Sequence, residues 1–301
     1  FKFPDDSFNP EFVGTFPKSL RNLYVGTDEL LGDEPVFKQF QFLENLSLRY
    51  ASVDLLQYLP PSLSKLETDQ FYVDNDPDPT APVLPCLKTF VPNTVFYEEN
   101  YTLEPVFRQM PNLKTFLARE TSIPNLADLH LPTSLTFMFL SNIKTFQNFT
   151  QYENLRELGL FDCEFPVEAF KDANTFPNMI RFGYFGHGRP WITVDNLVFP
   201  KNLRFFQIQA SISIEKWTLP KSLRRLELRG IDVGEDFEFN FPSGIYHLEI
   251  IDTQLQGLDD VMFPSELAIL RIMKNEHLRH IFIRASFKKW LANLESICKY
   301  M

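Results

Sequence analysis

The feature that most constrains this chain is a short leucine-rich phrase that returns along most of its length. One copy reads LPKSLRRLELRG at residues 219–230, and a near copy, FPKSLRNLYVG, stands at 16–26. Aligning these hexads gives twelve anchor positions at intervals of 20–26 residues, and periods of this size indicate a solenoid of stacked units. The anchors are Leu20, Leu43, Leu63, Leu87, Leu113, Leu135, Leu155, Met179, Leu203, Leu223, Ile245 and Leu267.

Each copy predicts a short strand that begins directly after a turn. Most anchors follow a proline phrase such as FPKSL or LPTSL, and proline fixes φ and ends the preceding segment. Beyond the anchor, Leu226 and Leu228 alternate with polar neighbours, which is the period of a half-buried strand. Because one unit cannot hide its own apolar edge, the units are expected to stack with their strands side by side in a parallel sheet.

The L-x-x-L-x-L hexads and their spacing resemble the leucine-rich-repeat superfamily over about residues 12–283. The resemblance implies an α/β repeat solenoid, a horseshoe with one parallel β-sheet on its concave face and irregular or short helical convex segments. Residues 103–110 and 166–174 are the helical candidates. We expect a single domain, 1–301, whose last open edge is covered by a capping helix at 284–301, where apolar residues recur at helical spacing.

The sequence departs from the superfamily at its asparagine position, where only Cys163 and Asn275 match. The ladder of buried asparagine side chains that the family uses is therefore mostly missing. The chain contains 32 Phe beside only 11 Gly. Phenylalanine is therefore predicted to fill the interior instead.

Sequence phrases typical of catalysis do not stand out. The glycines within 183–188 lack the G-x-G-x-x-G spacing of a phosphate loop. The pair His277 and His280 has no third metal ligand near it in the sequence. Cys163 occupies a buried repeat position, so it is not expected to act as a nucleophile. The chain is predicted to be non-catalytic, with no cofactor and no metal.

The number and spacing of the cysteines bear on the cellular compartment of the protein. Cys86, Cys163 and Cys298 are far apart and form no disulfide framework, which favours a cytoplasmic or nuclear location. Three N-x-S/T sequons keep a secreted location open as the less favoured alternative. Because every apolar stretch falls short of about 18 residues, no membrane-spanning segment is predicted.

Residues that flank the inward strand positions are expected to point out of the concave face. In repeats 6–9 five of these are phenylalanines and two neighbouring ones are glycines, which predicts a glycine-floored trough with an aromatic rim. Exposed aromatic clusters often mark binding surfaces; the alternative is that the rings pack on one another. With three arginines, the predicted partner-binding residues are Phe137, Phe139, Gly159, Phe161, Arg181, Gly183, Phe185, Phe205, Arg225 and Arg229.

The residue after the anchor is often basic, although the chain has a net charge of −10. A basic rim on an acidic body suits an acidic segment of a partner and, less readily, a phosphate backbone. The alternative is an ordinary solvated surface. The rim residues are Lys88, Lys114, Arg156, Arg204 and Arg224.

These features predict a non-catalytic protein–protein interaction module that binds a partner protein on its concave face. One option within this function is the substrate-recognition part of a ubiquitin ligase or another multi-subunit complex, which an F-box upstream of Phe1 would favour. Two alternatives stay open. One is binding of a nucleic acid or phosphorylated ligand through the basic rim, and the other is an extracellular recognition receptor. The oligomeric state is also open.

Overall fold

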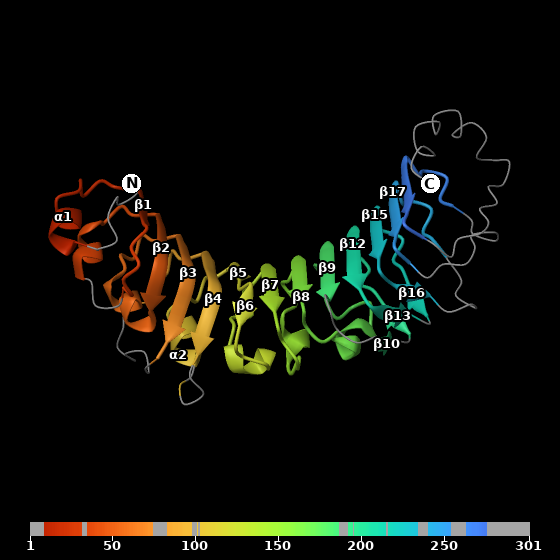
Figure 1. Ribbon diagram of the computed structural model, residues 1–301, viewed down its shortest axis with the longest axis horizontal. Coiled ribbons are helices and arrows are strands. Elements are labelled where there is room, and N and C mark those ends of the chain that lie inside the picture. Colours follow the sequence, from red (N-terminus) through yellow and green to blue (C-terminus); the bar gives the residue numbers. More distant parts are fainter. Residues whose placement is uncertain are drawn as a thin grey trace. The chain divides into compact units, whose positions relative to one another are not determined.

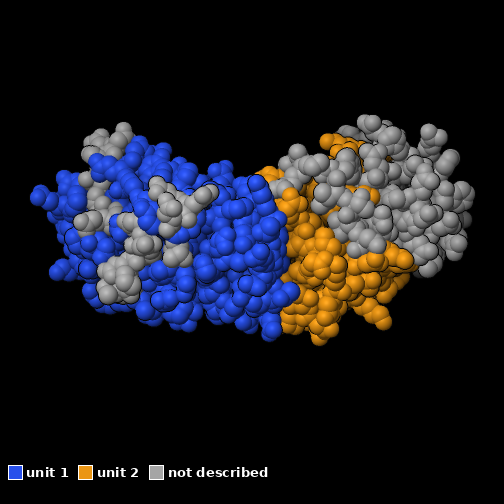
Figure 2. Space-filling view, turned by 90° about the horizontal axis from the view of Figure 1, so that it is seen from below, with its two compact units in different colours: residues 1–155 blue, residues 156–301 orange. Residues whose placement is uncertain are grey.

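The computed structural model describes residues 9–31, 35–74, 83–97, 101, 103–186, 192–194, 196–214, 216–233, 240–253 and 263–275. The chain divides into two compact units, 1–155 and 156–301, which Figure 2 shows in different colours. Each unit is described by itself, and a single domain over 1–301 stays a prediction. The expected capping helix at 284–301 and the two histidines of 277–280 lie outside the described residues.

The first unit contains parallel strands that pair in chain order, one strand per repeat (Figure 1). A two-residue strand, β6 (Glu120–Thr121), pairs with β4 in addition. The six strands that follow the repeat are β1 (Asn22–Val25), β2 (Asn45–Ser52), β3 (Lys65–Val73), β4 (Thr89–Tyr97), β5 (Thr115–Leu117) and β7 (Phe137–Ser141).

The second unit repeats the same arrangement. Its main sheet contains β8 (Glu157–Phe161), β9 (Arg181–Gly186), β12 (Phe205–Ala210), β15 (Arg225–Arg229), β17 (His247–Ile251) and β18 (Ile269–Met273). Between these strands the chain forms two smaller parallel sheets. One contains β10 (Ile192–Val194), β13 (Ile212–Ile214) and β16 (Asp232–Val233), and the other contains β11 (Leu197–Val198) and β14 (Trp217–Thr218).

In the described part of the chain the helices are short; the first precedes β1, and the others lie between the strands of successive repeats. Two are α-helical, α1 (Pro10–Gly14) and α2 (Glu104–Arg108), so a helix does form within 103–110. The segment 166–174 forms a shorter 3₁₀ helix. The 3₁₀ helices are η1 (Pro35–Gln39), η2 (Val53–Tyr58), η3 (Leu126–Leu129), η4 (Phe149–Gln151) and η5 (Val167–Phe170).

The anchor residues form the apolar core of both units. Eleven of the twelve anchors are 0–3% exposed, and Leu20, in the first repeat, is half-buried. Adjacent strands pair with the repeats in register, so that Leu226 of β15 lies beside Leu248 of β17. The predicted leucine-rich-repeat architecture, with one parallel strand per repeat and short helices between the strands, is confirmed.

The proline phrase folds as a turn that the anchor closes. The N–H of Leu223 donates to the carbonyl of Pro220 over 3.0 Å, and the other P-x-x-L phrases repeat this bond. Ser222 then reaches back one repeat, where its Oγ donates to the carbonyl of Leu203 at 2.7 Å. Ser62 and Ser134 make the equivalent bonds. The recurrent serine therefore satisfies a carbonyl of the preceding repeat, a role that the repeat pattern alone does not reveal.

Stacked aromatic rings fill the interior of the second unit, as the phenylalanine count predicts. Phe182 is fully buried and stacks on Phe206 with ring centroids 5.6 Å apart and on Phe170 at 4.6 Å. Phe165 contacts Phe182 at 6.1 Å with its ring steeply inclined. Aromatic pairs of this kind stabilise the fold beyond the contribution from burying their apolar surface.

The two matches at the family's asparagine position do different things. The side-chain oxygen of Asn275 accepts from the N–H and Oγ1 of Thr253, and its Nδ2 donates to the carbonyls of Ile250 and Met273. Cys163 is buried, and its thiol donates to the carbonyl of Phe161 at 3.4 Å. The side chain of Asn275 thus links two repeats, whereas Cys163 is linked to the next repeat through its backbone carbonyl, which accepts from the Tyr184 hydroxyl at 2.8 Å.

Candidate functional site

The sheet face of the second unit that lies opposite the leucine core carries most of the predicted partner-binding residues. Strand register places Gly159 beside Gly183 and Phe161 beside Phe185. Phe205 lies between Arg181 and Arg225 on neighbouring strands. We call Phe161, Phe185, Phe205, Arg181 and Arg225 the aromatic–basic face.

The predicted trough is partly filled at Gly183. A Cβ atom at this position would lie 2.9 Å from the ring of Phe185, so that ring leans over the glycine. Gly183 therefore lets the Phe185 ring approach the strand closely, where a larger residue would displace it. On the neighbouring strand, Phe161 remains 36% exposed, which is unusual for so large an apolar side chain.

Phe205 is held between two guanidinium groups. The guanidinium carbon of Arg181 lies 5.3 Å from the centre of the Phe205 ring, and that of Arg225 lies 5.2 Å from it. A cation within about 6 Å of an aromatic face is attracted by the ring quadrupole. Arg225 is also fixed from the other side, because its Nε donates to Glu227 at 2.6 Å. The ring and both arginines thus contact one another within the chain itself.

Two of the predicted residues lie in the first unit. Phe137 and Phe139 are half-buried on β7, where they pair with Thr115 and Leu117 of β5. The aromatic–basic face is therefore defined by the residues of the second unit alone.

The basic rim residues are all exposed. Lys88 and Lys114 belong to the first unit, and Arg156, Arg204 and Arg224 belong to the second. Their backbone carbonyls link the repeats, since that of Arg204 accepts from the N–H groups of both Arg224 and Arg225. The position after each anchor therefore has a structural role that does not depend on its side chain.

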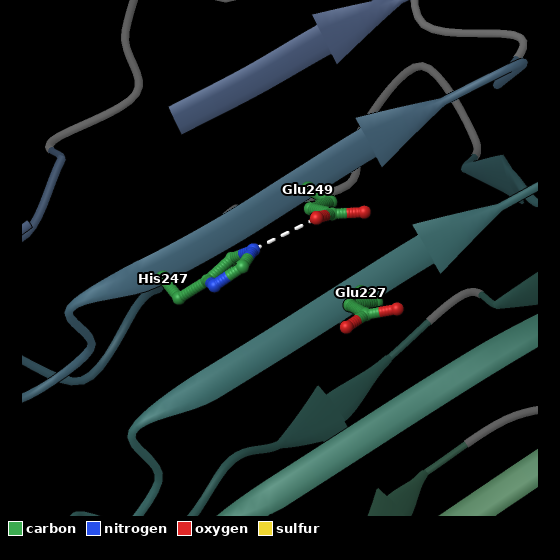
Figure 3. Close-up of side chains that lie close together, drawn as sticks. All are labelled: Glu227, His247 and Glu249. Carbon is green, nitrogen blue, oxygen red and sulfur yellow. Dashed lines mark hydrogen bonds and ion pairs between the residues drawn. The ribbon is translucent and has the colours of Figure 1, made fainter. Parts of the chain in front are cut away.

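A cluster that sequence reasoning missed lies beside this face, on β15, β17 and β18. Glu227 and Glu249 are neighbours in register (Figure 3). Both flank inward strand positions, where side chains are expected to point out of the sheet, yet their side chains are only 3% and 1% exposed. His247 is also buried, and its Nε2 lies 2.8 Å from Glu249 Oε1. The sequence does contain a signal for this cluster: two acidic residues fall in register on neighbouring strands, and arginines lie beside them on the same strands.

Arginines neutralise both carboxylates. Arg225 and Arg229 contact the two oxygens of Glu227. Arg229 also contacts Glu249 Oε2 at 2.9 Å, and Arg271 contacts Glu249 Oε1 at 2.8 Å. Buried charges are tolerated when they are paired in this way.

The ligand atoms of Glu227, His247 and Glu249 lie within 4.8 Å of one another, close enough to hold a metal ion. The donor set nevertheless fits a metal poorly. All four carboxylate oxygens already face a guanidinium, and a divalent cation would have to displace arginines while close to their positive charge. The cluster is better described as a buried ion-pair network than as a metal centre.

The pKa of Glu249 gives the network a measurable signature. Burial by itself raises the pKa of this carboxyl, but hydrogen bonds from His247 and Arg229 and the charge of Arg271 outweigh burial, so the pKa lies below its ordinary value of 4.5. A lowered pKa in the folded state stabilises the fold above the ordinary value, and this contribution is lost as the pH falls through the lowered pKa.

We therefore expect the free energy of unfolding to decline as the pH is lowered below about 4.5. Urea unfolding at a series of pH values between 3 and 7 measures this. The Glu249→Gln variant, which has no carboxyl to protonate at this position, should show a shallower decline. Equal slopes for the variant and the unmodified chain would contradict the assignment.

Neither a protein-family model nor a curated protein matches the chain. Among solved structures, it is similar to YopM from Yersinia enterocolitica at 17% identity and a TM-score of 0.45, over 90% of this chain and 50% of that one. It is similar to CroV588, described as a circular leucine-rich-repeat protein, at 15% identity and a TM-score of 0.47, over 89% of this chain and 50% of that one.

A leucine-rich-repeat protein of Leptospira interrogans is similar at 12% identity and a TM-score of 0.39, over 100% of this chain and 99% of that one. The chain thus spans about half the length of the first two structures. These identities bear on the fold alone, and the assignment of the fold rests on the repeat and its strand pairing. In the part of the chain that is described, no helix has the length and apolar character needed to cross a membrane.

Proposed function

We propose that this chain is a protein-binding module and that the aromatic–basic face of its second unit receives the partner. The observation that carries the proposal is the ordered Arg181–Phe205–Arg225 stack on the same sheet face as the exposed ring of Phe161. Aromatic and arginine side chains are the residue types that dominate binding energy at protein interfaces. Groups that are already ordered lose little conformational entropy on binding.

The structure of the face supports a protein partner rather than a small ligand. The side chains come from β8, β9, β12 and β15, so they spread over four parallel strands that lie about 4.8 Å apart. Such a spread suits an extended contact with another chain, because small-molecule sites are usually concave and enclosed. A cytoplasmic or nuclear location goes with this proposal, and the exposed free thiol of Cys86 supports it.

The variants Phe161→Ala and Gly183→Arg test the proposal. The first removes the exposed ring, and the second displaces Phe185, so both should weaken capture of the partner from extracts of the source organism by about tenfold or more. Thermal unfolding should change little, because neither side-chain position lies in the leucine core.

Phe42→Ala is the matched control, since Phe42 is 59% exposed and belongs to the first unit. Its capture should equal that of the unmodified chain. If neither face variant reduces capture, the aromatic–basic face is not the binding surface. A steep salt dependence that is abolished by Arg204→Glu and Arg224→Glu would instead support the basic rim and a nucleic acid.

A further inference from the structure

Two arginines of the ion-pair network flank a single buried carboxylate. Arg229, on β15, contacts one oxygen of Glu249, and Arg271, on β18, contacts the other. The Glu249 side chain is 1% exposed, whereas those of Arg229 and Arg271 are 35% and 57% exposed. Each guanidinium thus contacts the buried carboxylate on one side and is partly exposed to solvent.

The network carries more positive than negative charge. Glu227 and Glu249 supply two negative charges, and Arg225, Arg229 and Arg271 supply three positive ones, which leaves one positive charge when His247 is neutral. Among the described residues, Glu227 and Glu249 are the acidic groups that pair with Arg229 and Arg271. The excess positive charge is shared by three arginines that all reach the solvent: the side chains of Arg225, Arg229 and Arg271 are 39%, 35% and 57% exposed.

We propose that Arg229 and Arg271 form a subsite for one carboxylate, the side chain of a glutamate or aspartate on the bound partner. The proposal rests on the proposed function and adds the chemistry of the partner at this edge of the face. Arg271 contacts Glu249 through Nη1, so the Nε and Nη2 edge of its guanidinium can meet a planar carboxylate, while Arg229, whose Nη2 contacts both glutamates and whose Nε is buried, can add its Nη1. Glu249 holds both guanidiniums, so little side-chain entropy is lost on binding. A single excess charge matches a carboxylate better than a phosphate, which carries nearly two negative charges.

The neighbours of Arg271 suit the stem of an acidic side chain. Ile269 and Met273 lie on either side of it on β18 and are 39% and 48% exposed. The methylene groups of a bound glutamate would contact these apolar surfaces while its carboxylate meets the arginines. The subsite thus continues the aromatic–basic face across β17 to β18, since these strands pair in register with β15.

The test uses the full chain labelled with ¹⁵N and three capped tripeptides, Ala-Glu-Ala, Ala-Gln-Ala and Ala-phosphoserine-Ala. The Nε–Hε signal of Arg271 is followed by NMR during each titration. We expect a saturable shift with the glutamate peptide at millimolar concentrations and none with the glutamine peptide. Arg271→Gln should weaken binding of the glutamate peptide about tenfold, as followed through the remaining arginine signals.

Lys221→Gln is the matched control because Lys221 is an exposed cation of the same unit outside this cluster, and it should leave the titration unchanged. Equal losses in Lys221→Gln and Arg271→Gln would show non-specific attraction and overturn the subsite. Phosphoserine binding more than about tenfold tighter than glutamate binding would overturn the choice of a carboxylate. If the peptide binds as expected but Phe161→Ala leaves partner capture intact, the proposed function fails while the subsite stands; the reverse result removes only the subsite.

Discussion

Replacing Phe182 with alanine is expected to destabilise the second unit by about 3–5 kcal/mol. Phe182 is fully buried, and its ring contacts those of Phe165, Phe170 and Phe206 from three neighbouring segments. Removing it leaves a cavity between repeats that cannot collapse without shifting strands. Urea unfolding followed by circular dichroism measures the loss through the midpoint at constant slope.

The control for Phe182→Ala is Phe42→Ala, which removes the same ring from an exposed position and should change stability by no more than about 0.5 kcal/mol. If both variants cost the same, stacked phenylalanines do not hold the repeats together. The role inferred for the 32 phenylalanines would then be wrong.

The Glu249→Gln variant is expected to lower stability by about 1–3 kcal/mol. The amide keeps the shape of the side chain but cannot balance the charges of Arg229 and Arg271, and one of its two polar atoms would face them as a donor. Breaking a fully buried ion pair costs about 3–5 kcal/mol, but these arginines are partly exposed and can turn to water, so the smaller range applies.

Glu168→Gln is the matched control for this variant. Glu168 pairs with Lys171 at a position where its side chain is 84% exposed, and exposed pairs contribute about 0–1 kcal/mol. Equal effects at positions 249 and 168 would contradict a special role for the buried network. A gain in stability on Glu249→Gln would mean that the free-energy cost of burying the carboxylate exceeds the stabilisation from its ion pairs with the arginines.

Periodicity predicted the repeat because the physical cause is local and recurs. Each hexad buries its anchor, and apolar and polar residues alternate along the strand that follows. Because the copies are alike, aligning them predicts each strand and its register with the parallel strand of the next repeat. The pairing of Gly159 with Gly183, and of Phe205 with Arg181 and Arg225, could be predicted in this way.

The burial of Glu227 and Glu249 could not be predicted from alternation alone. Alternation says which face of the strand a side chain lies on, but it does not say whether arginines on neighbouring strands will close over that face. The lean of Phe185 over Gly183 has the same origin, since it depends on a rotamer rather than on a position in the repeat.

The serine of the proline phrase was visible in the sequence, but its role depends on the distance between repeats. Its hydroxyl reaches a carbonyl about twenty residues earlier in the chain. Only the stacked arrangement of neighbouring turns reveals such a bond.

The most direct measurement of the central claim is photo-crosslinking from the aromatic–basic face. A benzophenone amino acid is placed at Phe161, which is 36% exposed, and in a separate sample at Phe42, which is 59% exposed. If the face binds the partner, position 161 gives a discrete crosslinked protein that Gly183→Arg abolishes, and position 42 does not. Crosslinking of the same protein from position 42, or a product at 161 that survives Gly183→Arg, would contradict it.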